Sequence, residues 1–307
     1  GSSVEVVGVR IMLFEGFERR WVDTGDIILH CRIAGDGPPL LLLHGFPQSH
    51  VMWHAVAPRL AERFTVVAAD LRGYGDSAKP AGGPPHAAYA KRTMARDMVG
   101  LMARLGFARF DLVAHDRGAR VAHRLALDHP DVLERLALID IVATRTLFEA
   151  TDMAVAMAYE HWFFLAQPAP FPETMIGAAP IAYLHAKLGG WGTGLGAFAP
   201  AALAEYERGI QDPATVHAMC EDYRAAATID LDHDRADPAA RIACPLLVLW
   251  GEHGLMHRRF DVAATWRERH ARPAEVEARL VPAGHFLVEE APDATLAALQ
   301  PFLAAST

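Results

Sequence analysis

The stretch that decides the fold is Phe110-Asp111-Leu112-Val113-Ala114-His115-Asp116-Arg117-Gly118-Ala119-Arg120. The apolar run from Phe110 to Ala114 predicts a buried strand, and the segment from Arg117 to His129 predicts a helix. A strand that enters a helix through one tight turn is typical of a nucleophile elbow, and the residues two positions on either side of the nucleophile must be small. Ala114 and Gly118 meet this requirement, so the pattern places Asp116 in the nucleophile position.

Further strands and helices alternate with this unit. Short apolar runs bounded by turn residues predict strands at 26–33, 40–43, 64–69, 136–139, 246–250 and 278–281. Apolar spacing predicts helices over 94–105 and over 294–303, the second with Asp293 as its N-cap and with Pro301 kinking or shortening its end. The alternation predicts an α/β fold with a mostly parallel sheet and helices on both faces.

The alternation is interrupted between residues 147 and 230. This segment is rich in Ala, Met and aromatic residues, is broken by several prolines, and shows no clear strand, whereas the strand pattern resumes at Pro245. We therefore predict a helical cap, 147–230, inserted into a core formed by 1–146 and 231–307. The cap is expected over the carboxyl ends of the strands, where open α/β sheets bind ligands. A separate helical domain is the alternative, but the strand pattern continues on both sides.

Composition narrows the choice of partners and location. The chain has 307 residues, 52% of them hydrophobic, and a net charge of −8, which argues against nucleic acid and against an anionic membrane surface. Its three cysteines are scattered and lack metal spacing, which favours a reduced, cytoplasmic setting without a bound metal. No apolar run has the length of a membrane span, and residues 1–3 do not begin a secretory signal.

Asp116 has two interpretations. Aspartate is a common helix N-cap, so the residue alone is compatible with a structural role. A carboxylate nucleophile, in contrast, is already ionised at neutral pH and suits displacement at a saturated carbon that bears a leaving group. None of the five serines lies at a strand-to-helix elbow, which argues against ordinary serine hydrolysis; they are Ser2, Ser3, Ser49, Ser77 and Ser306.

Candidate partners of Asp116 follow two other strands. His44-Gly45-Phe46-Pro47 comes directly after the strand at 40–43, so the backbone N–H groups of Phe46 and Arg117 are placed to form an oxyanion hole. His285 lies on the loop after the last strand, where a general base is expected to activate a water molecule.

Two positions are open for the acid that would orient His285. The usual one follows the strand at 246–250, but Gly254 stands where an aspartate is expected and Glu252 is too close to the strand. The other is Asp140, at the end of the strand at 136–139. We prefer Asp140, which would stabilise the imidazolium of His285.

Taken together, five segments resemble the fluoroacetate (haloacetate) dehalogenases of the α/β-hydrolase superfamily, and the resemblance covers nearly the whole chain. They are Phe14-Glu15-Gly16-Phe17-Glu18-Arg19-Arg20, His44-Gly45-Phe46-Pro47-Gln48, Ala69-Asp70-Leu71-Arg72-Gly73-Tyr74-Gly75-Asp76-Ser77, His115-Asp116-Arg117-Gly118-Ala119-Arg120 and His161-Trp162. The fourth is the most specific, because haloalkane dehalogenases and epoxide hydrolases typically have tryptophan where this chain has Arg117.

The resemblance implies a role for each candidate residue. Asp116 would displace halide from the α-carbon of a haloacid and form an ester. Arg117 and Arg120 would hold the substrate carboxylate through charge-assisted, bidentate hydrogen bonds. The resemblance also implies a homodimer that acts without a cofactor.

The resemblance places the halide pocket in the insertion, at His161, Trp162 and Tyr223, whose N–H and O–H donors would stabilise a leaving fluoride. Tyr206 and Tyr183 remain alternatives to Tyr223. The segment Asp232-His233-Asp234 could suggest metal ligands, but we interpret it as a solvated loop.

Two other functions remain open. An epoxide hydrolase uses the same Asp–His–acid chemistry, but it would need two cap tyrosines and no arginine pair beside Asp116. A small-molecule receptor needs a pocket but no complete catalytic set.

Overall fold

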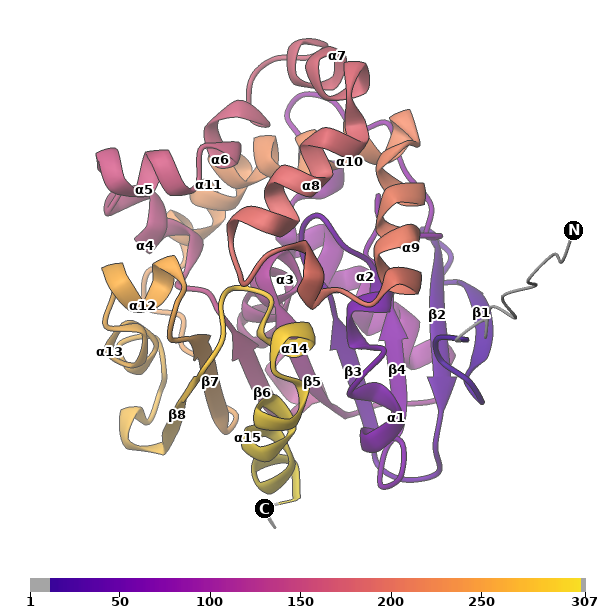
Figure 1. Ribbon diagram of the computed structural model, residues 1–307. Helices are drawn as coiled ribbons and strands as arrows, with labels where there is room; N and C mark the ends of the chain where they lie inside the picture. The colour runs from indigo at the N-terminus through magenta and orange to yellow at the C-terminus, as the bar shows by residue number, and fades with distance from the viewer. Residues whose placement is uncertain (1–11, 305–307) are drawn as a thin grey trace, which may run out of the picture.

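The computed structural model describes residues 12–304, in which one eight-stranded sheet forms the centre of the molecule (Figure 1). The strand order is β1-β2-β4-β3-β5-β6-β7-β8. β2 pairs antiparallel with β1 and β4, and the other neighbours are parallel. The strands are β1 (Glu18–Asp23), β2 (Ile28–Ala34), β3 (Pro39–Leu43), β4 (Thr65–Ala69), β5 (Phe110–His115), β6 (Leu133–Ile139), β7 (Leu246–Gly251) and β8 (Val276–Val281). The predicted α/β-hydrolase architecture is confirmed.

The predicted strands correspond to β2 through β8, and the prediction missed β1. The sequence of β1 is Glu-Arg-Arg-Trp-Val-Asp, and five of its six residues are exposed. An exposed antiparallel edge strand has no apolar run by which it could be recognised. The central strands show the opposite pattern, since β5 is buried along its whole length.

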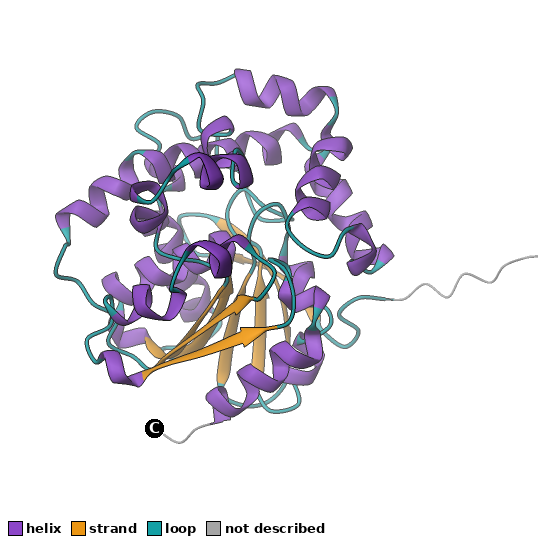
Figure 2. Cartoon of the chain, turned by 60° about the vertical axis from the view of Figure 1, so that its left-hand side comes forward, coloured by secondary structure: helices purple, strands orange, loops and turns teal. Residues whose placement is uncertain are grey.

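Helices lie on either side of the sheet (Figure 2). In Figure 1, α2 and α3 lie behind the strands, and α1, α14 and α15 lie in front of them. The helices of this part are α1 (Ala57–Leu60), α2 (Lys91–Arg104), α3 (Asp116–Asp128), α12 (Leu255–Arg259), α13 (Val262–Arg267), α14 (Leu287–Glu290) and α15 (Pro292–Ala304), with the short 3-10 helices η1 (His50–Trp53), η2 (Ala87–Tyr89), η3 (Pro130–Val132) and η5 (Pro273–Glu275).

Between β6 and β7 the chain forms helices that lie above the carboxyl ends of the strands (Figure 1). They are α4 (Thr144–Glu149), α5 (Met153–Ala158), α6 (His161–Phe164), α7 (Phe171–Ala178), α8 (Pro180–Gly190), η4 (Leu195–Ala197), α9 (Pro200–Ile210), α10 (Pro213–Ala227) and α11 (Ile229–Ala236). Residues 147–230, all of them described, contain no strand. This supports the proposed cap. None of the helices over 12–304 combines the length and the apolarity that a membrane crossing requires.

Three local predictions were wrong. Asp232, His233 and Asp234 lie in α11, not in a loop, because carboxylates are favourable in a first helical turn and Asp234 also pairs with Arg124. Asp293 is not an N-cap, since α15 already begins at Pro292. Pro301 does not end α15, which continues to Ala304, because a proline near the helix end removes only one backbone hydrogen bond.

Candidate active site

Asp116 lies at the sharp turn between β5 and α3. It has a φ of 51°, in the left-handed region that a residue with a Cβ rarely adopts. A Cβ at Gly118 would lie 2.3 Å from the backbone oxygen of His44, so the turn requires glycine there. The N-cap of α3 is His115, and therefore the capping interpretation of Asp116 is wrong. The strained turn instead presents the carboxylate at the carboxyl end of the central strand.

The Asp116 carboxylate has a donor at each oxygen. The backbone N–H of Phe46 donates to its Oδ1 at 2.8 Å, and Nε2 of His285 lies 3.5 Å from its Oδ2. The N–H of Arg117 belongs to the residue directly after the nucleophile, as an elbow oxyanion hole requires. The structure thus brings Phe46, Asp116 and His285 together from three separate segments of the chain.

Asp140 contacts the second nitrogen of the His285 ring. Its Oδ2 lies 2.5 Å from Nδ1 of His285, and its Oδ1 accepts a hydrogen bond from the backbone N–H of Gly251 at 2.9 Å. Glu252, the alternative acid, is exposed. A Cβ at Gly254 would lie 3.7 Å from both carboxylate oxygens of Asp140, so the two acid positions converge on one place. The geometry supports Asp140.

The charges of Asp116 and His285 depend on one another. Burial opposes ionisation of Asp116, but the hydrogen bond and charge of His285 outweigh burial and hold the pKa of Asp116 well below its usual range. For His285, burial favours the neutral ring, but Asp116 and Asp140 together raise its pKa to about 10. The resting site therefore contains an imidazolium between two carboxylates.

Two residues that sequence reasoning missed fix the backbone of His285. Nε2 of His115 lies 2.8 Å from the backbone oxygen of His285, and the N–H of His285 donates to the backbone oxygen of Trp191 at 2.8 Å. Burial, and next the charge of His285, lower the pKa of His115 to about 4, so its ring is neutral at pH 7. Trp191 lies far along the chain, and no local pattern points to it.

The two arginines of α3 have different partners. Arg117 is fully buried and forms an ion pair with Asp222 of α10, in which Nη2 and Nε donate to Oδ1 at 2.8 and 3.2 Å. Arg120 donates from Nη1 to the backbone oxygen of Val142 at 2.8 Å and to Oγ1 of Thr144 at 3.1 Å. Within residues 12–304, no carboxylate forms an ion pair with Arg120. Burial and the charge of Arg117 lower the pKa of Arg120 to about 10. The site thus contains a buried guanidinium that forms no direct ion pair.

His161, Trp162 and Tyr223 pack together above these arginines. The ring centroids of Tyr223 lie 5.2 Å from His161 and 5.7 Å from Trp162. The guanidinium of Arg120 lies 4.5 Å from the Trp162 ring, and that of Arg117 lies 4.1 Å from the Tyr223 ring. Oη of Tyr223 is buried and has no hydrogen-bond partner among the described residues.

Tyr206 and Tyr183, the two alternatives to Tyr223, have different environments. Oη of Tyr206 donates to the Glu289 carboxyl group at 3.1 Å, and Tyr183 packs against Phe164. Tyr223 is therefore the tyrosine that the structure brings to His161 and Trp162. A cavity of about 330 Å³, lined by Tyr159, Trp191 and Lys187 among others, reaches His285.

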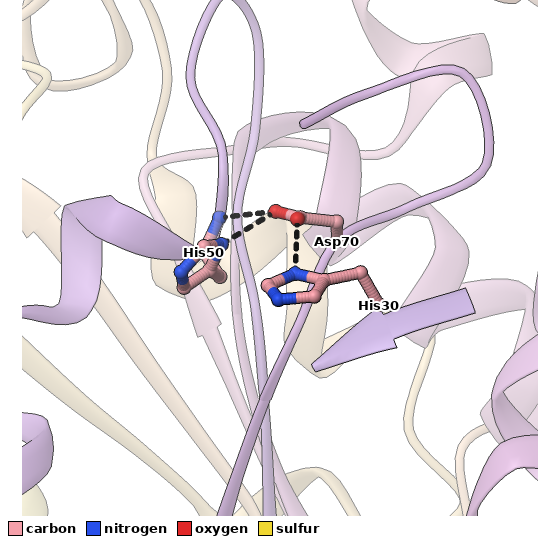
Figure 3. A group of neighbouring side chains, drawn as sticks. All are labelled: His30, His50 and Asp70. Carbon is pink, nitrogen blue, oxygen red and sulfur yellow. Dashed lines mark hydrogen bonds and ion pairs between the residues drawn. The ribbon is translucent and has the colours of Figure 1, made fainter. Parts of the chain in front are cut away.

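Among residues 12–304, one buried cluster outside this site has atoms close enough to hold a metal ion: His30, His50 and Asp70 (Figure 3). Nδ1 of His30 and Nδ1 of His50 lie 2.8 and 2.9 Å from the Asp70 carboxylate. The backbone N–H groups of His50 and Asp76 donate to the same two oxygens at 2.8 and 3.0 Å. Each oxygen therefore already has two donors, and we assign no metal to the cluster.

Comparisons with known proteins identify the same fold. Residues 38–292 match the alpha/beta hydrolase fold family. A structure of an α/β-hydrolase from Nostoc sp PCC 7120 superposes with a TM-score of 0.93 and 55% sequence identity, covering 96% of this chain and 100% of that chain. The fold and the elbow thus define an α/β-hydrolase.

Two curated relatives narrow the class. The chain is 51% identical to a fluoroacetate dehalogenase from Burkholderia sp over 292 aligned residues. The aligned region covers 95% of each chain. The chain is 34% identical over 271 residues to a soluble epoxide hydrolase from Corynebacterium sp., which covers 86% of this chain and 89% of the relative. The chain belongs to the haloacetate dehalogenase family, an enzyme family within the α/β-hydrolase superfamily.

Proposed function

We propose that this enzyme hydrolyses the carbon–halogen bond of a short 2-haloacid, with fluoroacetate as the first candidate, through an ester on Asp116. The observation that carries the proposal is the buried guanidinium of Arg120, which has no carboxylate partner beside the nucleophile. A buried guanidinium without a direct ion-pair partner is costly, so the pocket favours a substrate that supplies an anion within hydrogen-bond distance. The relative named as a fluoroacetate dehalogenase agrees with this choice.

Substrate binding would place the α-carbon at Asp116. The substrate carboxylate accepts hydrogen bonds from Arg120 and from Nη1 of Arg117, which has no hydrogen-bond partner among the described residues. The amino end of α3, where both arginines lie, also favours an anion. Binding then orients the carbon–halogen bond toward His161, Trp162 and Tyr223.

In the first chemical step, a carboxylate oxygen of Asp116 attacks the α-carbon. The carbon–halogen bond breaks, and the halide leaves with the bonding electron pair. The free Oη of Tyr223, together with donors from His161 and Trp162, stabilises the charge that develops on the halide. Fluoride needs this help most because it is the poorest leaving group among the halides.

In the second step, water cleaves the ester. Ester formation removes the negative charge of Asp116, which is one of the two charges that raise the pKa of His285. The imidazolium then loses its proton more readily, and neutral His285 can deprotonate the attacking water. The tetrahedral oxyanion accepts hydrogen bonds from the N–H groups of Phe46 and Arg117. The products from a haloacetate are glycolate, halide and a proton.

Epoxide hydrolysis is the second candidate, because one relative is a soluble epoxide hydrolase and a second buried tyrosine, Tyr159, packs against His161. An epoxide is neutral, however, and would leave Arg120 without a direct ion-pair partner. A non-catalytic receptor would not need the acid, base and nucleophile to be in contact. The homodimer and the cytoplasmic location stay predictions.

The test is direct. The protein is incubated separately with fluoroacetate, chloroacetate and styrene oxide, and free halide, glycolate and diol are measured. We expect equimolar halide and glycolate and no diol. Diol formation without halide release would favour the epoxide hydrolase, and no turnover of any substrate would favour the receptor.

A further inference from the structure

Asp222 of α10 connects the cap to the catalytic helix through one buried network. Its Oδ1 accepts hydrogen bonds from Arg117 and lies 2.5 Å from Nζ of Lys91, and its Oδ2 accepts a hydrogen bond from Oη of Tyr74 at 2.7 Å. Lys91 also pairs with Asp230, at 3.2 Å. The side chains of Arg117 and Asp222 are both fully buried.

This network occupies most of the donors of Arg117. Nε and Nη2 donate to Oδ1 of Asp222, and Nη2 also lies 3.4 Å from the backbone oxygen of Asp222. Nη1 is buried and has no hydrogen-bond partner among the described residues. Because a guanidinium is planar, fixing two of its nitrogens also fixes the direction of the third.

The charges in the network are balanced. Lys91 and Arg117 carry two positive charges, and Asp222 and Asp230 carry two negative charges, so the network has no net charge. Burial opposes ionisation of Asp222, but the charges of Arg117 and Lys91 outweigh burial and hold its pKa below the usual range. Asp222 therefore stays ionised across the neutral range.

We propose that Asp222 is a positioning residue for substrate binding: it holds the Arg117 guanidinium so that Nη1 alone points to the substrate carboxylate. The inference rests on the proposed function, since it assumes a carboxylated substrate. Without Asp222, Arg117 can turn toward other acceptors, and the directional hydrogen bond to the substrate is lost. The cap thereby sets the geometry of a binding group that belongs to the core.

The direction in which Asp222→Asn changes the affinity for an anion distinguishes a positioning role from a purely electrostatic role. Asp222→Asn adds one net positive charge to the pocket, so a purely electrostatic role predicts tighter binding of an anion. Loss of positioning predicts weaker binding. The probe is glycolate, the proposed product, measured as a competitive inhibitor of chloroacetate turnover. Asp230→Asn is the matched control, because it adds the same charge beside Lys91 and does not contact Arg117.

We expect Asp222→Asn to raise the glycolate Ki about tenfold or more, the range for losing a charge-assisted hydrogen bond. Asp230→Asn should leave the Ki unchanged or lower it. In an Arg117→Gln background, adding Asp222→Asn should change the Ki by less than about twofold, because the residue through which Asp222 acts is gone.

A lower or unchanged Ki in Asp222→Asn, or an equal rise in the Arg117→Gln background, would overturn the proposal. If Asp222→Asn does not fold, Tyr74→Phe replaces it, because that change loosens Asp222 and removes no charge. The glycolate Ki must then rise when Tyr74→Phe is made in the wild type, and must not rise when it is made in Arg117→Gln. An unchanged Ki in the wild-type background overturns the proposal. Failure of the proposed function is a different result: the wild type itself would release no halide from chloroacetate, whereas failure of the positioning role leaves wild-type turnover intact.

Discussion

Nδ1 of His285 lies 2.5 Å from Oδ2 of Asp140, although 145 positions separate the two residues in the chain. This contact orients the ring toward Asp116 and stabilises the imidazolium. We expect Asp140→Asn to lower kcat by about 10³- to 10⁴-fold, as in other triads that lose their acid, because the amide can leave the ring in the wrong tautomer. Steady-state halide release measures this effect.

Glu252→Gln is the matched control for the acid. Glu252 is exposed and follows β7, where the acid of such a site usually lies. Its substitution should leave kcat within about twofold, as is usual for a change away from the site. A large loss in Glu252→Gln together with an active Asp140→Asn would reverse the assignment.

Arg120→Met tests the unpaired cation. Removing a charged donor of the substrate carboxylate should raise KM for chloroacetate by about 10- to 100-fold. Arg124→Met is the control, since Arg124 lies one helical turn further along α3 and pairs with Asp234 and Asp237 outside the pocket. That variant should lose stability and keep its KM. Equal KM values for all three proteins would show that Arg120 does not bind the substrate.

Tyr223→Phe tests the halide pocket. Loss of the Oη donor should reduce kcat for fluoroacetate by about 10- to 100-fold and should reduce it less for chloroacetate, because fluoride depends more on hydrogen bonds as it leaves. Tyr206→Phe, whose hydroxyl contacts Glu289, should leave the ratio of the two rates unchanged. An equal loss on both substrates in Tyr223→Phe would argue against a role in stabilising fluoride.

Glu289 makes stability depend on pH. Burial raises the pKa of this carboxyl from 4.5 to about 8, against smaller opposite effects from Gln48 and Tyr206. An acid with a raised folded-state pKa keeps its proton in the folded protein, so the wild type loses stability as pH rises from 4.5 to 8. Glu289→Gln cannot ionise, and its advantage should grow by up to about 1.4 kcal/mol per pH unit over this window.

Urea denaturation of both proteins between pH 4 and pH 9 measures that advantage. The two stability curves should run parallel below the window and diverge within it. Parallel curves throughout would mean that Glu289 ionises normally in the folded protein.

Local sequence was sufficient for the elbow and for most of the sheet. The small residues around Asp116 and the apolar run of β5 are neighbours in the chain, so together they predict the elbow from the sequence. The strand β1 was missed because its residues face water and carry charge. We predicted a loop for the segment that forms α11 because its aspartates resemble a polar linker. In the structure, partners such as Arg124 stabilise the segment as a helix.

The ion pair of Arg117 with Asp222 could not be predicted. The two residues lie 105 positions apart, and neither β periodicity nor helical spacing connects them. The prediction placed both arginines on the substrate carboxylate, but Asp222 already occupies two nitrogens of Arg117. Long-range pairing of buried charges follows from how the helices between β6 and β7 pack on the rest of the chain, and that is visible only in three dimensions.

The ester on Asp116 is the central claim, and a single turnover in ¹⁸O-labelled water tests it most directly. Enzyme in excess over chloroacetate is quenched, and the glycolate and the peptide that contains Asp116 are analysed by mass spectrometry. The proposed mechanism predicts ¹⁸O in the Asp116 carboxylate and unlabelled glycolate from the first turnover. Labelled glycolate with an unlabelled Asp116 would mean that water attacks the substrate directly and would contradict the mechanism.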